Sequence, residues 1–504
     1  MNRCKRISRR SIFGPRWALE RLEDRTLLSG NVLASVSKSG ELVVLGSSNG
    51  NEILIQSTSG GALQVSGLAG TTINGGSGPF TATGFTQNLY VYMTASSAVV
   101  DIGGSGTLTT LPHSLFVWTF ANNETVAIEN ASIGSNVHIF GGIGSDTFTI
   151  GSTSTESAVT VGGSVFIFGG MGGTNTIAVF AANITDSLDI TTSGVNDQVE
   201  VGFDAGLGII GVDEPAHVNI GINLDITTGD DPSWPFFGRD SFGFGDPWCG
   251  FTGGIGDGLF SIGGSCGSDS AGFGDWAGNE LAFTQGWSGS GGDPSPSVSG
   301  VGGADVGLAD VSVAGNVKIQ TGNGNDQILL GAATAPPGGA YPLVFGPLTV
   351  GGNLSVTAGN GNDTLLSDGI TVTGNTNFTT GNGNDDIAVL GNAGYFNGTF
   401  TISTGSGNER IAVINGATFV SSVTIGVGHG TNVLWIAQSL FLGSVTINGD
   451  SGTNTLLESQ SIYPNSFTAG NPVLNSIQTQ MLDVSPTDPI VTTNFGWLNT
   501  LLGV

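Results

Sequence analysis

Residues 370–391 read ITVTGNTNFTTGNGNDDIAVLG, and they show the local pattern from which the fold can be predicted. Apolar and polar residues alternate in its short runs, a pattern typical of strands that bury one face. The runs are separated by turns rich in Gly and Asn, two residues that adopt a positive φ at low cost. No helical periodicity is present. The stretch therefore predicts short strands joined by tight turns.

The stretch is one copy of an internal repeat of about 22 residues. Residues 348–369 and 311–331 match it, and residues 49–55 hold an early copy. The final residues of the successive turns are Asp146, Asn175, Asp197, Asp326, Asp363, Asp385, Glu409, Asn432 and Asn454. The longer step from Asp326 to Asp363 contains two prolines and two glycines at 336–339, which indicates a loop inserted between coils.

A unit of this length cannot bury an apolar face alone, so consecutive units must stack on one another. Stacking at the inter-strand spacing of about 4.8 Å gives parallel sheets along the axis of the stack. Equivalent Asn residues then align, and each can pair with its copy one coil away. The predicted fold class is all-β, a parallel β-solenoid or β-helix with coils of about 22 residues, interrupted by a Gly/aromatic-rich insertion. Separate sandwich domains are the alternative, but they predict a repeat of about 100 residues.

We expect six segments along the chain. They are a basic N-terminal export-type segment at 1–29, a degenerate β-repeat region at 30–130, solenoid coils at 131–230, the insertion at 231–300, regular solenoid coils at 301–460, and a C-terminal cap or tail at 461–504. A cap would protect the last open sheet edge from pairing with another chain.

Charge separates the first segment from the rest of the chain. The net charge is −27, and residues 1–25 hold eight of the 12 basic residues. The remaining chain has four basic and 36 acidic residues, a net charge of −32. Because phosphate groups are bound by Lys and Arg, this composition argues against nucleic acid as a partner. No run reaches the roughly 18 apolar residues of a membrane-spanning helix.

Residues 22–29 resemble the LEPR-XLL segment found near the N-terminus of large, repeat-rich exported bacterial proteins. The matching residues are Leu22, Glu23, Arg25, Leu27, Leu28 and Ser29, while Asp24 replaces the proline of that pattern. The resemblance implies an exported β-strand-repeat protein that is extracellular or located at the cell surface. A short amphipathic helix is the alternative interpretation of these residues.

The turns resemble the RTX nonapeptide Gly-Gly-x-Gly-x-Asp-x-apolar-x, whose turns bind Ca²⁺. Residues 141–148 fit this pattern fully, and the turns ending at Asp326, Asp363 and Asp385 fit it except at the first Gly. The resemblance implies Ca²⁺ ligands at Asp146, Asp326, Asp363 and Asp385, since carboxylate and carbonyl oxygens suit this ion. However, RTX repeats recur every nine residues or so, whereas this turn occurs once per coil. The alternative is a degenerate, structural turn whose Asp or Asn hydrogen-bonds the local backbone, with no cofactor required.

The insertion at 231–300 breaks the repeat and concentrates aromatic residues in a Gly/Ser/Asp background. A segment this long between elements is usually either functional or disordered. Its tryptophans are Trp234, Trp248, Trp276 and Trp287. They are candidate partner-binding residues, for cell-surface glycans or matrix proteins, because exposed aromatic rings stack on sugars or contact proteins. Cys249 and Cys266 are a candidate disulfide in an oxidising compartment, and two free thiols are the alternative.

The residues needed for catalysis are sparse. A polysaccharide lyase needs a base and cations that hold the sugar carboxylate, but only four Lys or Arg residues follow residue 25. A hydrolase needs a carboxylate pair, and Asp385 and Asp386 are adjacent on a strand, where neighbours point to opposite faces. We therefore expect a non-catalytic extracellular or cell-surface protein with a structural or adhesive role. The alternatives are an RTX-like protein whose folding Ca²⁺ assists outside the cell, and a polysaccharide-acting β-helix enzyme.

Overall fold

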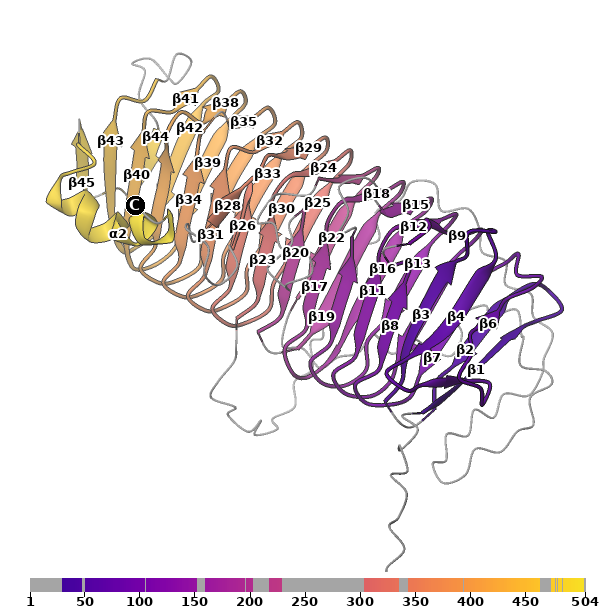
Figure 1. The fold of residues 1–504 in the computed structure, drawn as a ribbon. Coiled ribbons are helices and arrows are strands. Elements are labelled where there is room, and N and C mark those ends of the chain that lie inside the picture. Colours follow the sequence, from indigo (N-terminus) through magenta and orange to yellow (C-terminus); the bar gives the residue numbers. More distant parts are fainter. Residues whose placement is uncertain are drawn as a thin grey trace, which may run out of the picture. The chain divides into compact units, whose positions relative to one another are not determined.

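The computed structural model describes residues 30–47, 50–104, 106–151, 159–194, 196–202, 217–228, 303–334, 343–392, 394–462, 473–475, 477, 479–482 and 484–502. The described residues within 1–229 and 302–504 form one compact unit, and most of them lie in strands that stack in parallel along one axis (Figure 1). The predicted all-β parallel solenoid is therefore confirmed.

Each coil contributes one strand to each of three sheets. In chain order, β33 (Thr376–Thr379) lies in sheet I, β34 (Asp386–Leu390) in sheet II and β35 (Tyr395–Phe396) in sheet III. The next strand, β36 (Phe400–Ser403), returns to sheet I beside β33. Paired residues of successive coils are about one repeat apart, so Leu365 pairs with Ile387, and Ile387 pairs with Ile411.

The three sheets contain the following strands. Sheet I consists of β1 (Asn31–Val36), β2 (Leu42–Leu45), β5 (Thr72–Ile73), β7 (Leu89–Met93), β10 (Leu115–Thr119), β13 (Val137–Phe140), β16 (Val165–Met171), β19 (Leu188–Ser193), β22 (Leu224–Thr227), β25 (Val317–Gln320), β30 (Leu354–Thr357), β33, β36, β39 (Val423–Val427), β42 (Val445–Gly449) and β44 (Val473–Asn475). Sheet II consists of β3 (Glu52–Ser57), β4 (Leu63–Leu68), β6 (Phe80–Thr81), β8 (Val99–Ile102), β11 (Thr125–Ile128), β14 (Thr147–Ile150), β17 (Thr176–Val179), β20 (Gln198–Val201), β23 (Asp305–Leu308), β26 (Gln327–Leu330), β27 (Ala332–Thr334), β28 (Leu343–Phe345), β31 (Thr364–Asp368), β34, β37 (Arg410–Ile414), β40 (Thr431–Ala437), β43 (Thr453–Ser459) and β45 (Thr479–Leu482). Sheet III consists of β9 (Thr109–Leu111), β12 (Ala131–Ile133), β15 (Val159–Val161), β18 (Ala182–Ile184), β21 (Val218–Ile220), β24 (Val311–Val313), β29 (Leu348–Val350), β32 (Thr371–Val372), β35, β38 (Thr418–Phe419) and β41 (Leu440–Phe441).

The core fills the inside of the coils with one apolar layer per coil. Alternate residues of each strand point inward, and in β30 these are Leu354 and Val356. In the C-terminal coils, Phe419 stacks between Phe396 and Phe441, with ring centroids 5.0 and 4.9 Å apart. Because every coil repeats the same inward positions, the core is continuous along the stack.

The stack continues across the insertion. Strand β22, which precedes it, pairs in parallel with β25, which follows it, and Ile226 lies opposite Ile319. The chain thus resumes in register after the inserted residues. The tip of the predicted loop near 336–339 lies outside the described residues, and the two strands beside it, β27 and β28, pair in antiparallel fashion.

The N-terminal region differs from the regular coils. Strand β1 pairs with β2, and β3 pairs with β4, in antiparallel fashion. The parallel stack then begins where β7 joins β2 and β8 joins β3. These hairpins replace regular coils at this end, and this explains why the repeat is hard to recognise in the sequence of 30–130.

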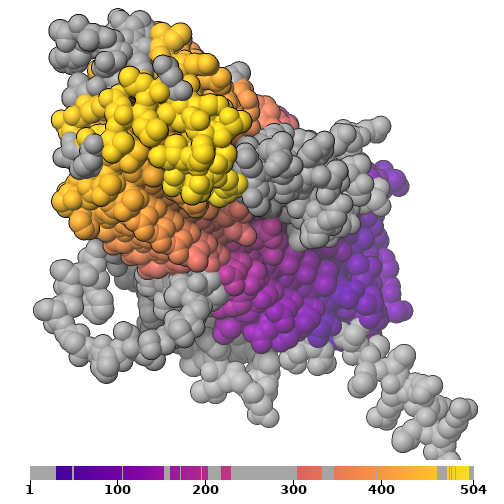
Figure 2. Space-filling view, turned by 90° about the vertical axis from the view of Figure 1, so that its left-hand side faces the viewer, coloured from indigo at the N-terminus to yellow at the C-terminus, as the bar shows by residue number. Residues whose placement is uncertain are grey.

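The C-terminal segment forms the helix α2 (Pro489–Leu502), which packs against the outer face of sheet II. The ring of Phe495 lies 5.5 Å from that of Trp435 on β40, and the guanidinium of Arg410 on β37 lies 5.7 Å from the ring centre of Trp497. In Figure 2 the C-terminal residues, in yellow, lie against the orange coils that precede them. No helix among the described residues is long and apolar enough to cross a membrane.

Candidate functional site

The Gly-Asn-Gly-Asn-Asp turns join sheet I to sheet II and lie above one another in successive coils. In the turn at 381–385, Asn382 and Asn384 are exposed, whereas Asp385 points inward and is buried. The glycines are required because neighbouring turns are in contact. A Cβ on Gly383 would lie 1.5 Å from the carbonyl oxygen of Gly361 one coil earlier.

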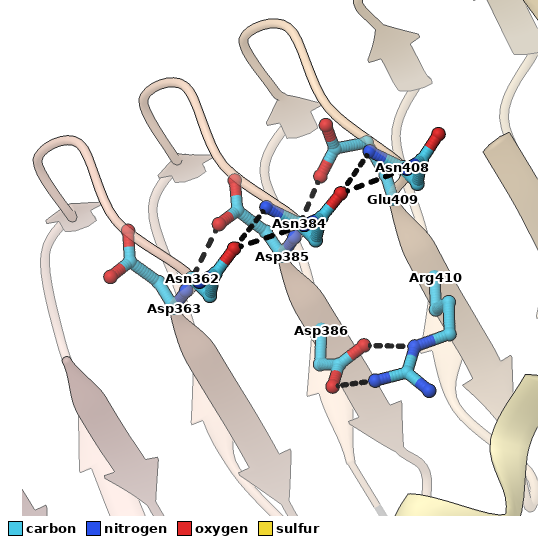
Figure 3. Close-up of polar contacts among 8 residues, drawn as sticks. All are labelled: Asn362, Asp363, Asn384, Asp385, Asp386, Asn408, Glu409 and Arg410. Atoms are coloured by element: carbon cyan, nitrogen blue, oxygen red, sulfur yellow. Dashed lines mark hydrogen bonds and ion pairs between the residues drawn. The ribbon is translucent and has the colours of Figure 1, made fainter. Parts of the chain in front are cut away.

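The exposed asparagines form two rows along the solenoid, as the repeat predicted. The side chain of Asn382 donates a hydrogen bond of 3.0 Å to the Oδ1 of Asn360, and Asn384 donates one of 3.2 Å to that of Asn362. Each Oδ1 also accepts the backbone N–H of the next Asn in its row. These bonds tie adjacent turns together at the surface (Figure 3).

The buried turn-end residues form a third row, which we call the acid column: Asp326, Asp363, Asp385 and Glu409. One side-chain oxygen of each residue accepts the backbone N–H of the equivalent residue one coil earlier (Figure 3). These distances are 3.0 Å from the Asp326 nitrogen to Asp363, 3.0 Å from Asp363 to Asp385, and 3.0 Å from Asp385 to Glu409. The column therefore links the coils through their interior.

The same arrangement occurs earlier in the chain. Asp146 accepts the N–H of Glu124 at 3.0 Å, and Asp197 accepts that of Asn175 at 2.8 Å. Ala304 occupies the equivalent position between Asp197 and Asp326, and its N–H bonds to Asp326 at 2.7 Å. The four predicted Ca²⁺ ligands thus stand at equivalent positions, but only Asp326, Asp363 and Asp385 follow one another in adjacent coils.

The second carboxylate oxygens in these turns fall into two groups. Those of Asp326 and Asp197 accept hydrogen bonds, from the hydroxyl of Thr321 at 2.6 Å and from the N–H of Gly194 at 2.8 Å. Those of Asp146, Asp363, Asp385 and Glu409 are buried and accept none. All four residues named as Ca²⁺ ligands are at most 3% exposed. The backbone N–H groups that they bind belong to the preceding coil and not to their own turn, which differs from the structural alternative given above. Ca²⁺ binding stays a prediction.

Burial changes the acid–base properties of the column. It raises the pKa of Asp363 to about 7 and that of Glu409 to about 8, because a buried carboxylate loses its hydration and faces other acids. Loss of hydration also raises the pKa of Asp385, whereas the hydrogen bond from the Asp363 N–H lowers it. Burial therefore makes these carboxyl groups weaker acids than exposed ones.

Asp385 and Asp386 point to opposite faces of the sheet, as expected for neighbours on a strand (Figure 3). Asp386 faces outward, where both of its carboxylate oxygens bind the guanidinium of Arg410. Arg410 also lies over Trp497 of α2. Asp385 thus forms a hydrogen bond in the interior, and Asp386 forms an ion pair at the surface. The two carboxylates do not face one another as the catalytic pair of a hydrolase does.

Sequence reasoning missed an aromatic ladder on the outer face of sheet I. Its residues are Tyr90, Tyr92, Phe116, Trp118, His138, Phe140, Phe166 and Phe168, two from each of the strands β7, β10, β13 and β16. Rings of adjacent strands stack with nearly parallel planes. The ring centroids are 4.6 Å apart for Tyr92 and Trp118 and 4.7 Å apart for Phe116 and His138. Two aromatics at alternate positions in four consecutive sheet I strands were the available signal.

The environment of the ladder is partly apolar. Burial among the rings lowers the pKa of His138 to about 4, so this imidazole is neutral at pH 7. Further along the same face, the outward positions become acidic at Asp189 and Asp225, and then polar from β30 to β42. One face of sheet I thus changes from aromatic to polar along the solenoid.

A groove of about 540 Å³ lies at the corner between sheets II and III. Its lining includes Asp368, Leu390, Asn392 and Asn415. The Asn392 amide donates a hydrogen bond of 2.7 Å to the Asp368 carboxylate, which is itself largely buried.

Several predicted residues lie outside the described part of the chain. These are the LEPR-XLL-like residues 22–29, Trp234, Trp248, Trp276 and Trp287, and the Cys249 and Cys266 pair. Comparison with protein-family models, with curated proteins and with solved structures finds no match to this chain.

Proposed function

We propose that this chain is a non-catalytic structural and adhesive solenoid that acts outside the cell or at its surface. The observation that carries the proposal is the outer face of sheet I, where an aromatic ladder and rows of polar residues lie on one continuous parallel sheet. A sheet held together by repeated inter-coil bonds is a rigid support, and an aromatic stripe on it is a contact surface.

The arrangement of the rings favours a protein partner over a glycan. Rings of adjacent strands cover one another's faces, since their planes are parallel within 13° and their centroids are close. A sugar ring binds an aromatic residue by stacking on such a face. Phe116 and Trp118 of β10 are half-buried, so part of each ring stays exposed, and these parts suit the apolar side chains of a matrix protein.

Location outside the cell is supported by the resemblance of residues 22–29 to the LEPR-XLL segment. The strongly acidic composition supports it only indirectly, by arguing against partners rich in phosphate. The alternative is an RTX-like protein whose folding is assisted by Ca²⁺. It predicts that millimolar Ca²⁺, but not Mg²⁺, raises the melting temperature of the full-length chain above its value in EDTA, whereas the proposal made here predicts no change.

Replacing Trp118 with Ala tests the contact surface. Trp118 touches the rings of Tyr92, Phe116 and Phe140, so its loss interrupts the ladder at its centre. We expect the full-length variant to lose at least about tenfold in affinity for a bound matrix protein, as is typical of a central aromatic contact residue. Retention of the chain on surface-extracted protein and on surface polysaccharide, compared side by side, measures the effect.

The matched control is Thr401→Ala, on the polar part of the same face in β36. It should leave both retention and melting temperature unchanged. Equal retention of the Trp118 variant and the unaltered chain would remove the ladder from the binding surface. Selective retention on polysaccharide would make a glycan the partner.

A further inference from the structure

One row of the aromatic ladder ends next to two aspartates. Phe166 on β16 is the last ring of this row, and it stacks on His138 of β13 with ring centroids 4.7 Å apart. The next two outward positions of the same row hold Asp189 on β19 and Asp225 on β22. The outer face of sheet I therefore changes from aromatic rings to carboxylates within two strands.

The last ring of the row leaves one face toward the aspartates. In a parallel stack, each ring turns one face to the strand before it and the other face to the strand after it. One face of Phe166 covers His138, and the other is turned toward β19, where Asp189 stands opposite it in the sheet. The face of an aromatic ring attracts a cation, and so does a carboxylate. The end of the row thus combines two groups that favour positive charge.

The two aspartates keep their negative charge in the described part of the chain. They lie opposite each other on neighbouring strands, and one oxygen of Asp225 is buried and accepts no hydrogen bond from the described residues. Lys318 lies opposite Asp225 on β25 and lowers its pKa, but the described residues hold no ion pair between them. Burial and the charge of Asp225 raise the pKa of Asp189 to about 6, so Asp189 is ionised at pH 7.5.

We propose that the protein partner of the aromatic ladder carries a basic side chain next to its apolar residues, and that this side chain binds between Phe166 and the aspartates 189 and 225. The inference rests on the proposed function, because it names the chemistry of the partner that the ladder contacts. The apolar residues of the partner supply contact area on the rings. The cation fixes where the partner lies along the face, because the carboxylates stand at one end of the row only.

The charge of the whole chain favours the same partner. Beyond residue 25 the net charge is −32, which attracts basic proteins and repels acidic ones. Two carboxylates also suit the cation of a side chain better than a calcium ion, which takes roughly six to eight oxygen ligands. A basic side chain needs only the ring and the carboxylates, since Arg binds both kinds of group.

The test measures the affinity of the full-length chain for three synthetic peptides, by calorimetry at pH 7.5 in EDTA. The peptides share an alternating Leu-Ser segment and end in two Arg, two Gln or two Glu residues. We expect the arginine peptide to bind at least about fivefold more tightly than the glutamine peptide, as is typical of exposed cation–π and charge contacts. The glutamate peptide should bind least. The double variant Asp189→Asn, Asp225→Asn should bind the arginine and glutamine peptides equally.

The matched control removes two acids far from the ladder. Asp450→Asn combined with Glu458→Gln, at the turn before β43 and on that strand, changes the net charge by the same amount. This variant should keep the preference for arginine. If both double variants lose the preference, the overall charge of the chain attracts the peptide, and the proposal is overturned. It is also overturned if the preference survives in the aspartate variant.

Trp118→Ala separates this proposal from the contact function on which it rests. It should weaken the binding of all three peptides by a similar factor and leave the preference for arginine. Weaker binding of the Trp118 variant, together with an unchanged preference in the aspartate variant, would contradict the placement of the cation alone. Unchanged binding of the Trp118 variant would contradict the contact function of the ladder.

Two further measurements identify other occupants of the aspartates. Millimolar Ca²⁺ that displaces the arginine peptide from the unaltered chain, and that Mg²⁺ does not replace, would place a metal ion there and overturn the proposal. Sedimentation of the chain at increasing concentration tests a second copy as the occupant. Self-association that Asp189→Asn and Asp225→Asn together abolish would overturn the proposal in favour of that copy.

Discussion

Gly383→Ala is expected to destabilise the solenoid by about 3 kcal/mol, the upper part of the range for overpacking a tightly packed site. The new Cβ would lie 1.5 Å from the carbonyl oxygen of Gly361 and 2.5 Å from its carbon. The turn cannot move away freely, because the Gly383 N–H donates to Ser406 one coil later at 3.0 Å. Relief of the clash would therefore break the stacking of the turns.

The control for this substitution is Gly426→Ala. Gly426 is an outward residue of β39, and the nearest atom to a Cβ there is 3.8 Å away. We expect an effect within about 0.5 kcal/mol, as for most surface substitutions. Urea unfolding followed by circular dichroism measures both variants. Equal stability of the two would mean that the turns of adjacent coils are not in contact.

Phe419→Ala is expected to cost about 3–5 kcal/mol, the range for deleting a fully buried aromatic ring. Phe419 is completely buried, and it contacts Phe396 and Phe441 by stacking and Phe400 edge-on at 4.8 Å. Rigid strands on three sides cannot close the cavity. The loss should appear as a lower urea midpoint for the C-terminal coils.

Thr418→Ala is the control for Phe419, since Thr418 precedes it on β38 and points outward. Its replacement should change the midpoint little. A small effect of Phe419→Ala would show that the ring is not enclosed. The register of β38 would then be shifted by one residue, with Phe419 pointing outward and Thr418 inward.

The sequence was sufficient to predict the coil, its register and its turns. The apolar alternation identifies the inward positions, and the turn at 381–385 recurs along the chain. These features depend on contacts between equivalent residues, which a repeat shows directly. Only the structure shows that the Asp of each such turn points inward and its two Asn point outward. The aromatic ladder was missed because its rings occupy only four strands of sheet I and have no counterparts in the regular coils. Trp118 and its neighbours therefore stand out only once the strands are aligned.

The helix α2 was missed for a different reason. Its sequence, with Thr, Asn and Gly in the interior, has low intrinsic helix propensity, and we expected a cap or tail. Packing of Phe495 and Leu498 against sheet II provides the missing stability. Asp488 followed by Pro489 is a common start of a helix, and it was the available signal. The roles of the two carboxylate oxygens of Asp385 depend on the positions of individual atoms, which no sequence pattern shows.

Cross-linking tests whether equivalent turns of adjacent coils stack in register. Asn362→Cys and Asn384→Cys would be combined in a full-length chain whose three native cysteines are replaced by Ser. The two asparagines are hydrogen-bonded across adjacent coils, so oxidation should form the disulfide.

The control pair is Asn362→Cys with Asn408→Cys, which stand two coils apart. Two inter-strand spacings, about 9.6 Å, exceed the roughly 7 Å that a disulfide can span between Cα atoms. Mass spectrometry of the linked peptides should find a bond between positions 362 and 384 and none between 362 and 408. No bond in the first pair, or a bond in the second, would contradict the parallel, in-register solenoid.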